Sequence, residues 1–431
     1  MKRVNIGLIG FGTVGSGVAR ALLERKSLLA KRSGIELVLK KICDKDLSRR
    51  RSVIVNKSLL TDNVNEILND KEIDIVIELI GGIHPAKEII IEALKKGKHV
   101  VTANKALLAE EGLGLFKLAD RLNKNIYFEA SVGGGIPLIK SLKEGLVANR
   151  VEAIYGIVNG TCNFILTQMS ERGISFKDAL AEAQKRGFAE RKPTLDIEGF
   201  DSAHKLAVLT QLAFGKFVKM SDIFIEGISR ISLQDIRYAA ELGLVIKLLA
   251  IAKKEKDELE VRVHPTMIPR DHLLASVGGA FNAIYISADM VGDMLFYGLG
   301  AGQNPTASAV VSDLVSLAQA LNGEEAYVRP FDFSQGKSIR HLRKIDQIST
   351  RFYIRFMAID KPGIFAKISG ILGKYKISIA SVAQKERRRA KIVPVVIITH
   401  EALEKSMRIA LEKINKLAIV KEAVAIRMEE T

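Results

Sequence analysis

A glycine-rich turn close to the start of the chain constrains its fold more than any other feature. The apolar run Val4–Ile9 leads directly into G-F-G-T-V-G, which has the spacing G-x-G-x-x-G. In a strand–turn–helix unit, the first glycine permits a tight turn and the second lets a pyrophosphate approach the backbone. The third lets helix and strand pack closely, and the helix N-terminus offers N–H groups to the phosphates. The sequence therefore predicts a Rossmann-type α/β domain, whose cofactor-binding turn consists of Gly10, Gly12, Thr13, Val14 and Gly15.

The end of the second predicted strand, residues 36–42, carries conflicting signals about the cofactor. Asp44 follows this strand, and an acid there binds the free ribose 2′-hydroxyl of NAD. Three consecutive arginines come next, and guanidinium groups suit the 2′-phosphate of NADP. We expect NADP to be weakly preferred over NAD, and a solvated basic turn is the alternative. The cluster consists of Arg49, Arg50 and Arg51.

Further strand–helix units continue the predicted sheet and bring polar groups to its edge. The strand H-V-V-T ends in A-N-K, so Lys105 stands at a carboxyl end, where ligands bind in open α/β sheets. Lys105 is therefore expected near the nicotinamide, although a plain surface lysine is the alternative. The glycine run at 133–135 precedes Pro137 and predicts a loop whose carbonyls turn inward, as for a monovalent cation.

The segment Glu190–Lys205 combines four carboxylates with a lysine at the head of an apolar helical run. Asp201 and Lys205 are four residues apart and would share one face of a helix. Carboxylates can hold an ammonium group and a lysine can exchange a proton, so this pattern suits an amino-acid substrate. The alternative is an exposed ion pair that contributes about 0.3–0.5 kcal/mol.

Composition excludes several classes of protein. The chain has 431 residues and a net charge of +16, but its basic residues are spread along it without an aromatic stacking platform. We therefore expect no nucleic-acid partner. No charge-free apolar run approaches the roughly 18 residues of a membrane helix. Cys43 and Cys162 lie in unrelated segments and show no metal or redox spacing, which fits a reducing cytoplasm.

Six motifs, taken together and in order, resemble the homoserine dehydrogenase family. They are G-F-G-T-V-G, T-A-N-K, E-A-S-V-G-G-G-I-P, N-G-T-C-N-F-I-L, L-D-I-E-G-F-D-S-A-H-K and G-A-G-Q-N-P-T-A-S-A-V-V-S-D. The resemblance covers roughly residues 1–325, and D-x-x-G-x-D-x-x-x-K is its most specific motif. It implies NAD(P)-dependent interconversion of L-homoserine and L-aspartate 4-semialdehyde by a homodimer or homotetramer.

The resemblance also implies roles for individual residues. The catalytic residues would be Lys205 and Lys105. The substrate would be bound by Glu190, Asp196, Asp201, Gly160 and Thr161. A sodium or potassium ion would be held by the backbone carbonyls of Glu129, Val132, Gly134 and Ile136. Gly300 opens the segment that rejoins the nucleotide domain and would lie at the cofactor.

The C-terminal part follows the order β-α-β-β-α-β, which is ferredoxin-like. RNA-recognition modules share this order, but their aromatic RNA-binding strand is missing. The segment resembles an ACT domain, which implies an amino-acid effector, with threonine expected, at Asp360 and Gly363. A dimerisation module without a ligand is the alternative. Pro394 lies within a predicted strand and favours an edge position or a bulge.

The expected organisation has three domains and a linker. The nucleotide domain would comprise residues 1–135 and 300–327, and the α+β substrate and dimerisation domain residues 136–299. A linker at 328–347 would lead to the ACT domain at 348–431, so truncation near Gln347 should leave a folded enzyme. Two other functions stay open. A semialdehyde dehydrogenase would need Cys162 as nucleophile, and an amino-acid sensor would carry an inactive dehydrogenase domain.

Overall fold

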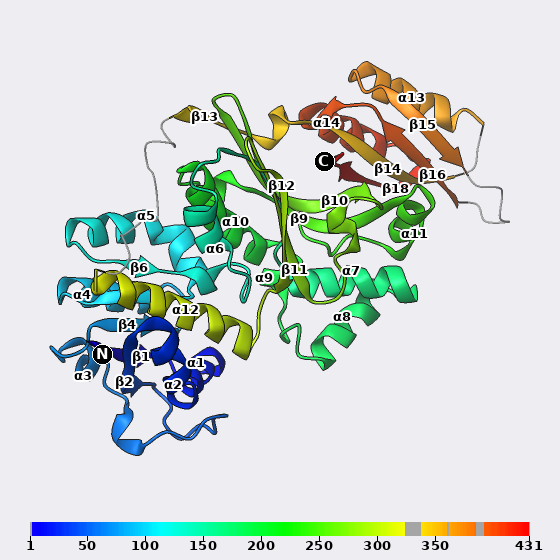
Figure 1. Ribbon diagram of the computed structural model, residues 1–431. Coiled ribbons are helices and arrows are strands. Elements are labelled where there is room, and N and C mark those ends of the chain that lie inside the picture. Colours follow the sequence, from blue (N-terminus) through cyan, green and yellow to red (C-terminus); the bar gives the residue numbers. More distant parts are fainter. Residues whose placement is uncertain (1, 324–337, 360–361, 385–391, 431) are drawn as a thin grey trace. The chain divides into compact units, whose positions relative to one another are not determined.

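The computed structural model describes residues 2–323, 338–359, 362–384 and 392–430, and the chain forms two compact units (Figure 1). The first unit comprises Met1–Glu152, His204–Met220 and Phe281–Ser338. The second comprises Ala153–Ala203, Ser221–Ala280 and Ile339–Thr431. The hairpin segment 281–299 thus groups with the nucleotide-binding part, and the C-terminal segment groups with the second unit, unlike the ranges expected from the sequence.

The first unit contains a parallel sheet with the strand order β3-β2-β1-β4-β5-β6. This is the order of the Rossmann fold, so the fold predicted from the glycine turn is confirmed. The first strand begins two residues earlier than predicted, and the second is one residue longer than predicted at each end. The strands are β1 (Lys2–Ile9), β2 (Ile35–Cys43), β3 (Leu60–Thr61), β4 (Ile75–Glu78), β5 (His99–Thr102) and β6 (Ile126–Tyr127).

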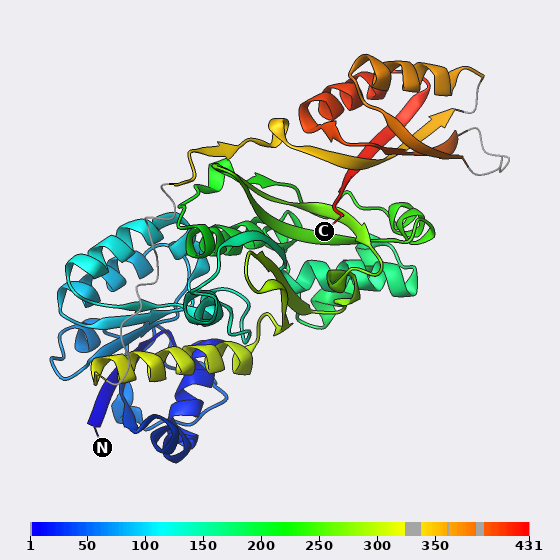
Figure 2. The same ribbon diagram turned by 45° about the horizontal axis from the view of Figure 1, so that its top comes forward.

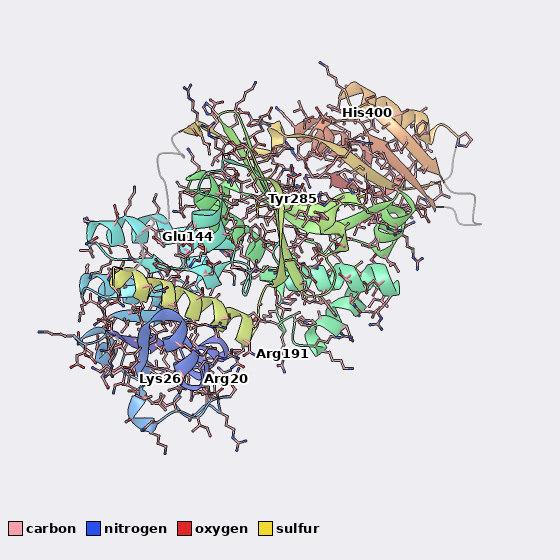
Figure 3. All side chains as sticks on the ribbon, viewed as in Figure 1. Arg20, Lys26, Glu144, Arg191, Tyr285 and His400 are labelled. Carbon is pink, nitrogen blue, oxygen red and sulfur yellow. The ribbon has the colours of Figure 1, made fainter. Side chains whose placement is uncertain are left out.

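Helices of the first unit cover this sheet, and the last helix of the unit packs against the first. Helix α1 packs against α12, where a Cβ on Gly17 would lie only 2.9 Å from the Gln303 carbonyl oxygen. Arg20, labelled in Figure 3, donates from α1 to Asn304 at 2.5 Å. The helices are α1 (Thr13–Glu24), α2 (Lys26–Ser33), α3 (Asn65–Leu68), α4 (Ala86–Lys95), α5 (Lys105–Arg121), α6 (Leu138–Lys140) and α12 (Gln303–Leu321).

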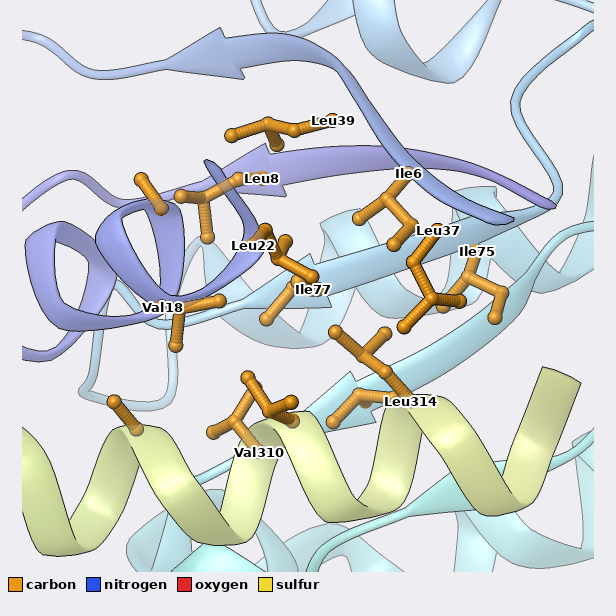
Figure 4. Packing of buried hydrophobic residues seen from close by; sticks show 14 of the residues in the cluster. Ile6, Leu8, Val18, Leu22, Leu37, Leu39, Ile75, Ile77, Val310 and Leu314 are labelled. Atoms are coloured by element: carbon orange, nitrogen blue, oxygen red, sulfur yellow. The ribbon is translucent and has the colours of Figure 1, made fainter. Parts of the chain in front are cut away.

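Aliphatic side chains from the strands and from these two helices form the core of the first unit (Figure 4). Ile6 and Leu8 of β1 face Val18 of α1 and Val310 of α12 in one buried cluster. Each such side chain stabilises the fold by about 1.5–3 kcal/mol when it leaves water. The core therefore fixes the glycine turn, because β1 and α1 flank that turn. An antiparallel hairpin, β11 (Phe281–Ala288) and β12 (Gly292–Leu299), also belongs to this unit.

The second unit is built on long antiparallel strands with helices beside them. Strand β9 lies between β7 and β10, and β10 also pairs in parallel with β8 and β13. The strands are β7 (Val151–Ile157), β8 (Phe224–Ile225), β9 (Leu244–Glu255), β10 (Glu258–Pro269) and β13 (His341–Arg343). The helices are α7 (Gly160–Arg172), α8 (Phe176–Lys185), α9 (Thr194–Ile197) and α11 (Leu233–Glu241). Helix α10 (Phe200–Phe214) begins in the second unit and continues into the first.

The C-terminal segment has the predicted ferredoxin-like fold, with the sheet order β18-β14-β16-β15 and two helices on one face (Figure 2). Its strands are β14 (Ser349–Ile359), β15 (Ile379–Gln384), β16 (Ile392–Thr399), β17 (Ala402–Leu403) and β18 (Val420–Met428). Its helices are α13 (Ile364–Lys374) and α14 (Glu404–Asn415). Strand β18 also pairs with β10, so this sheet continues that of the second unit.

The expectation that Pro394 marks an edge strand is wrong. Strand β16 lies between β14 and β15, and Pro394 is opposite Met357 of β14. Among the described residues, pairing with β15 ends at Val395, one residue away.

Candidate active site

In the glycine turn of the first unit, two glycines are required for packing and a third is open to a ligand. Gly10 has φ +99°, and a Cβ there would lie 2.7 Å from the Leu79 carbonyl oxygen. A Cβ on Gly15 would lie 2.0 Å from the Gly10 carbonyl oxygen, whereas a Cβ on Gly12 would meet nothing within 4 Å. Gly10 and Gly15 are thus required by the fold, and Gly12 faces open space as a pyrophosphate requires. Thr13 beside it is exposed and Val14 is half-buried.

The acid and the arginines after β2 have different surroundings. Asp44 accepts a hydrogen bond from the Phe11 N–H at 2.6 Å and lies 3.5 Å from the guanidinium of Arg51. Arg51 also donates to the Phe11 carbonyl at 2.9 Å and lies over the Phe11 ring. The Arg51 side chain therefore stabilises the glycine turn through its contacts with Phe11 and Asp44, whereas Arg49 and Arg50 are exposed.

A buried carboxylate, which the sequence analysis missed, holds the strand tip that carries Lys105. Glu78 at the end of β4 accepts from the Thr102 hydroxyl at 2.7 Å and from the Ile80 N–H at 2.8 Å. Thr102 in turn accepts from the backbone N–H of Asn104, whose side chain caps α5. Lys105 is the first residue of that helix, so this hydrogen-bond network fixes the position of the Lys105 backbone. An acid that ends an otherwise apolar strand was the available signal.

The loop predicted to bind a cation is a tight turn in the first unit. Gly133 and Gly134 have φ +75° and +58°, and a Cβ on Gly134 would lie 2.5 Å from the Gly300 carbonyl. Glu129 is buried and accepts from the N–H groups of Ile139 and Lys140 at 2.8 Å each. Burial raises the pKa of the Glu129 carboxyl. Its side-chain oxygens serve the turn, and the atom that the sequence analysis expects at a cation is its backbone carbonyl.

The other carbonyls expected at the cation belong to the same turn. Val132 is fully buried, and the Ile136 N–H donates to the Gly133 carbonyl at 3.0 Å. Neutral oxygen ligands in a turn that two left-handed glycines permit are compatible with a hard monovalent cation. Gly300 packs against Asn282, where a Cβ would lie 1.9 Å from the amide nitrogen, so this position requires glycine for packing.

A single asparagine joins two of the predicted substrate carboxylates in the second unit. The amide nitrogen of Asn159 donates to Asp196 at 2.8 Å and to Asp201 at 2.9 Å. Its amide oxygen accepts from the Cys162 N–H at 2.8 Å and caps α7. Asn159 is 5% exposed, so this arrangement is locked. Two carboxylates held side by side concentrate negative charge, which suits an ammonium group.

Asn159 was missed in the sequence analysis because its role depends on partners about 40 residues away. The local signal was an asparagine directly before a helical run, a common N-cap. Gly160 starts the helix, and a Cβ there would lie 2.6 Å from the Ala280 carbonyl. Thr161 donates to the Phe188 carbonyl at 2.6 Å. Glu190 is exposed, and its backbone carbonyl accepts from Gln184 at 3.0 Å.

Helix α10 carries both Asp201 and Lys205, as the spacing predicts. Four residues advance a helix by about 6 Å, so the two side chains leave the same face one turn apart. Lys205 is 8% exposed, which removes the alternative of an exposed surface pair.

Comparison with known proteins assigns the chain to a family. Models of the homoserine dehydrogenase NAD-binding domain, of homoserine dehydrogenase and of the ACT domain match residues 10–129, 137–315 and 352–418. Homoserine dehydrogenase from Neisseria gonorrhoeae is 43% identical over 432 residues, covering 100% of this chain and 99% of that protein. The chain belongs to the homoserine dehydrogenase family. It is accordingly an oxidoreductase, and the three domain types expected from its motifs are confirmed.

Solved structures of the homoserine dehydrogenase family agree with this fold. A homoserine dehydrogenase from Thiobacillus denitrificans matches with a TM-score of 0.92 and 42% identity, covering 100% of this chain and 99% of that one. A hyperthermophilic archaeal homoserine dehydrogenase mutant in complex with NADPH matches with a TM-score of 0.62 and 28% identity. It covers 73% of this chain and 98% of that one.

The surroundings of Cys162 count against the semialdehyde dehydrogenase alternative. The side chain is fully buried, and its thiol donates to the Asp196 carbonyl at 3.1 Å. A nucleophilic cysteine needs a thiolate in a partly exposed, electropositive setting, which this thiol lacks. Cys162 is therefore a packing residue in the first turn of α7.

The remaining predicted site lies in the ACT domain. Gly363 has φ +84° and precedes α13, so the turn needs glycine at this position. Asp360, the second residue expected at an effector, lies outside the described residues. Across the residues that the structure describes, no helix has the length and apolarity to span a bilayer.

Proposed function

We propose that this chain catalyses the reversible NAD(P)-dependent interconversion of L-homoserine and L-aspartate 4-semialdehyde. The single observation that carries the proposal is the amide of Asn159, which holds Asp196 and Asp201 together at the start of the helix that bears Lys205. A substrate with an ammonium at one end and a reacting oxygen at the other suits this spacing.

The ammonium of homoserine binds the carboxylates of Asp196 and Asp201, and Glu190 adds a third acid from its exposed loop. Gly160 and Thr161 bind the substrate at the start of α7. Charge-assisted hydrogen bonds to carboxylates are roughly twice as strong as neutral ones, so this end of the substrate provides orientation. The remaining chain of the substrate then extends along α10.

The proton is moved by a lysine. One helical turn, about 6 Å, is of the order of the length of a four-carbon amino acid. Lys205 therefore reaches the terminal oxygen of a substrate whose ammonium is bound at Asp201. It exchanges the proton at that oxygen, and Lys105 stabilises the charge that develops there. When bound, the nicotinamide supplies the hydride chemistry.

The cofactor is NADP in preference to NAD. Arg49 and Arg50 are exposed and precede Arg51, which contacts Phe11 of the glycine turn, and their guanidinium groups are available to a 2′-phosphate. Arg51 supports Phe11 and Asp44 and contributes indirectly. A sodium or potassium ion is held by carbonyls of Glu129, Val132, Gly134 and Ile136, whose neutral oxygens match its charge.

Regulation is assigned to the C-terminal domain. An amino acid, threonine in the first instance, binds at the turn of Asp360 and Gly363 and changes the activity. The working assembly is a homodimer or homotetramer in the cytoplasm, where reducing conditions suit two cysteines that form no disulfide.

One assay tests the proposal. Reduction of NADP and of NAD is followed by the absorbance of the reduced nicotinamide with L-homoserine, with L-serine as a control substrate and with threonine added or omitted. Homoserine-dependent reduction with NADP favoured is the expected result. Binding of threonine without turnover of either cofactor would support an amino-acid sensor with an inactive dehydrogenase domain instead.

A further inference from the structure

A buried lysine in the second unit has no role in the proposed mechanism. Lys247 of β9 is 4% exposed. Its ammonium donates to the Val277 carbonyl at 2.6 Å and to the side-chain oxygen of Asn163 at 3.3 Å. Both partners are neutral, so the charge is solvated by dipoles rather than neutralised by an acid in contact.

The contacts of Lys247 converge on one segment, residues 277–280. The amide nitrogen of Asn163 donates to the carbonyls of Val277 and Gly279 at 3.1 and 3.0 Å. The Thr167 hydroxyl accepts from the Gly279 N–H at 3.1 Å. Three side chains from β9 and α7 thus fix the backbone of this short segment.

The fixed segment lies directly against the substrate loop. A Cβ on Gly160 would be 2.6 Å from the carbonyl oxygen of Ala280, so the two backbones are in close contact. Gly160 follows Asn159, whose amide holds Asp196 and Asp201. A shift of segment 277–280 would therefore move the residue that sets the spacing of the carboxylates.

We propose that Lys247 is a positioning residue for homoserine, acting through segment 277–280 on the substrate loop at Asn159 and Gly160. The inference rests on the proposed function, which supplies the substrate. Lys247 touches neither substrate nor cofactor in this role. It holds a backbone carbonyl in place, and that carbonyl sets where the loop can lie.

The pKa of Lys247 helps to distinguish a positioning role from a contribution to folding stability. Burial lowers the pKa of Lys247 to about 8, against an opposing effect from Glu171 of α7. A depressed pKa means that the stability from this site is complete above the unfolded pKa, near 10.5, and is lost as the pH falls through about 8. At pH 7, methionine at this position should therefore fold at least as stably as lysine.

The test compares Lys247→Met with Lys98→Met in the full-length protein. Lys98 is a matched control, because it is buried in the first unit and donates to the Ile73 carbonyl at 3.0 Å. Lys247→Met should raise the KM for homoserine by about fivefold or more, the scale of lost hydrogen bonds. The KM for NADP should change by less than about twofold, with no loss of Tm at pH 7. Lys98→Met should leave the homoserine KM unchanged.

A pH series adds a second readout. Above pH 8 the amine of Lys247 loses its charge and becomes a weaker donor. The homoserine KM of the wild type should rise above pH 8 more steeply than that of Lys247→Met. An unchanged KM, or a joint loss of Tm and of both KM values, would overturn the inference while leaving the proposed function intact. A wild type that does not turn over homoserine would overturn both.

Discussion

Arg355 of the C-terminal sheet and Asp235 of helix α11 form a buried ion pair with two contacts. The Nε–Oδ1 distance is 2.6 Å and the Nη2–Oδ2 distance is 3.1 Å. The Tyr353 hydroxyl also donates to Asp235 at 3.2 Å. Asp235 completes a capping box with Ser232 at the start of α11. The Asp235 carboxylate therefore caps the first turn of α11 and also binds the arginine of the ACT sheet.

Arg355→Met should destabilise the protein strongly. It leaves Asp235 buried without its cation, and breaking a buried pair in this way costs about 3–5 kcal/mol. Arg408→Met is the control, because Arg408 pairs with Asp346 on the surface, where such pairs contribute about 0–1 kcal/mol. Urea unfolding of the two variants measures the difference. Equal effects would mean that the buried pair contributes no more than a surface one.

Further buried ion pairs join the C-terminal segment to the rest of the second unit. Arg262 on β10 pairs with Glu429 at 2.6 Å, and Arg427 pairs with Glu226 at the same distance. Removal of the chain beyond Gln347 would take away these partners of Asp235 and Arg262 and would unpair β10 from β18. A folded, active enzyme is therefore not the expected product, although the motif order alone suggested a detachable module.

The two proposed catalytic lysines should be indispensable. Lys205→Ala and Lys105→Ala should each lower kcat at least roughly 100-fold, the contribution typical of an acid–base group. Lys117→Ala is the control, since Lys117 is exposed on the same helix as Lys105. Steady-state kinetics and a thermal melt separate loss of chemistry from loss of fold. Near-normal turnover in either variant removes that lysine from the mechanism.

Asn159→Ala should weaken substrate binding selectively. Two carboxylates lose the donor that they share, so the KM for homoserine should rise roughly 10-fold or more. The change also removes a helix cap, which by itself costs about 1 kcal/mol of stability. Ser175→Ala removes the comparable cap of α8 and is the matched control. If Ser175→Ala raises the homoserine KM as much, loss of the cap rather than of the shared donor is responsible.

Arginines of the basic cluster should separate into two groups. Arg49→Ala and Arg50→Ala should raise the KM for NADP far more than that for NAD, because only NADP carries a 2′-phosphate. Arg51→Ala should affect both cofactors, since it removes the support of Phe11 and Asp44. Ratios of the two KM values provide the measurement. Equal changes for NADP and NAD in the first pair would identify a solvated turn and make Asp44 the guide, favouring NAD.

Local sequence patterns were sufficient to predict the secondary-structure elements, but the roles of several residues depend on partners that lie far away in the sequence. The glycine spacing and the alternation of strands and helices were sufficient for the Rossmann order, because each signal lies within one strand–turn–helix unit. Arg51 was expected at a phosphate, but its guanidinium contacts Phe11, 40 residues earlier. Asn159 and Lys247 have partners 37 and 30 residues away, and nothing near them in the sequence specifies those contacts.

His99 should make the stability of the first unit depend on pH. It is 7% exposed, and its Nδ1 accepts from the Asn125 N–H at 3.1 Å. Burial lowers the pKa of His99 to about 4, and the charge of Lys124 acts in the same direction. The unfolded chain therefore takes up this proton first as the pH falls. Stability from His99 is complete above about pH 6.5 and is lost as the pH falls through about 4.

The shift corresponds to about 3 kcal/mol across this window. His99→Gln should flatten the decline in unfolding free energy between pH 7 and pH 4 by about that amount, as measured by urea unfolding at several pH values. His400→Gln is the control, because His400 is exposed (Figure 3). Since the Nδ1 acceptor requires a neutral ring, protonation breaks the bond to Asn125 as well as burying a charge. An unchanged slope in His99→Gln would show that the folded protein accommodates the charged ring, and that its burial does not control acid stability.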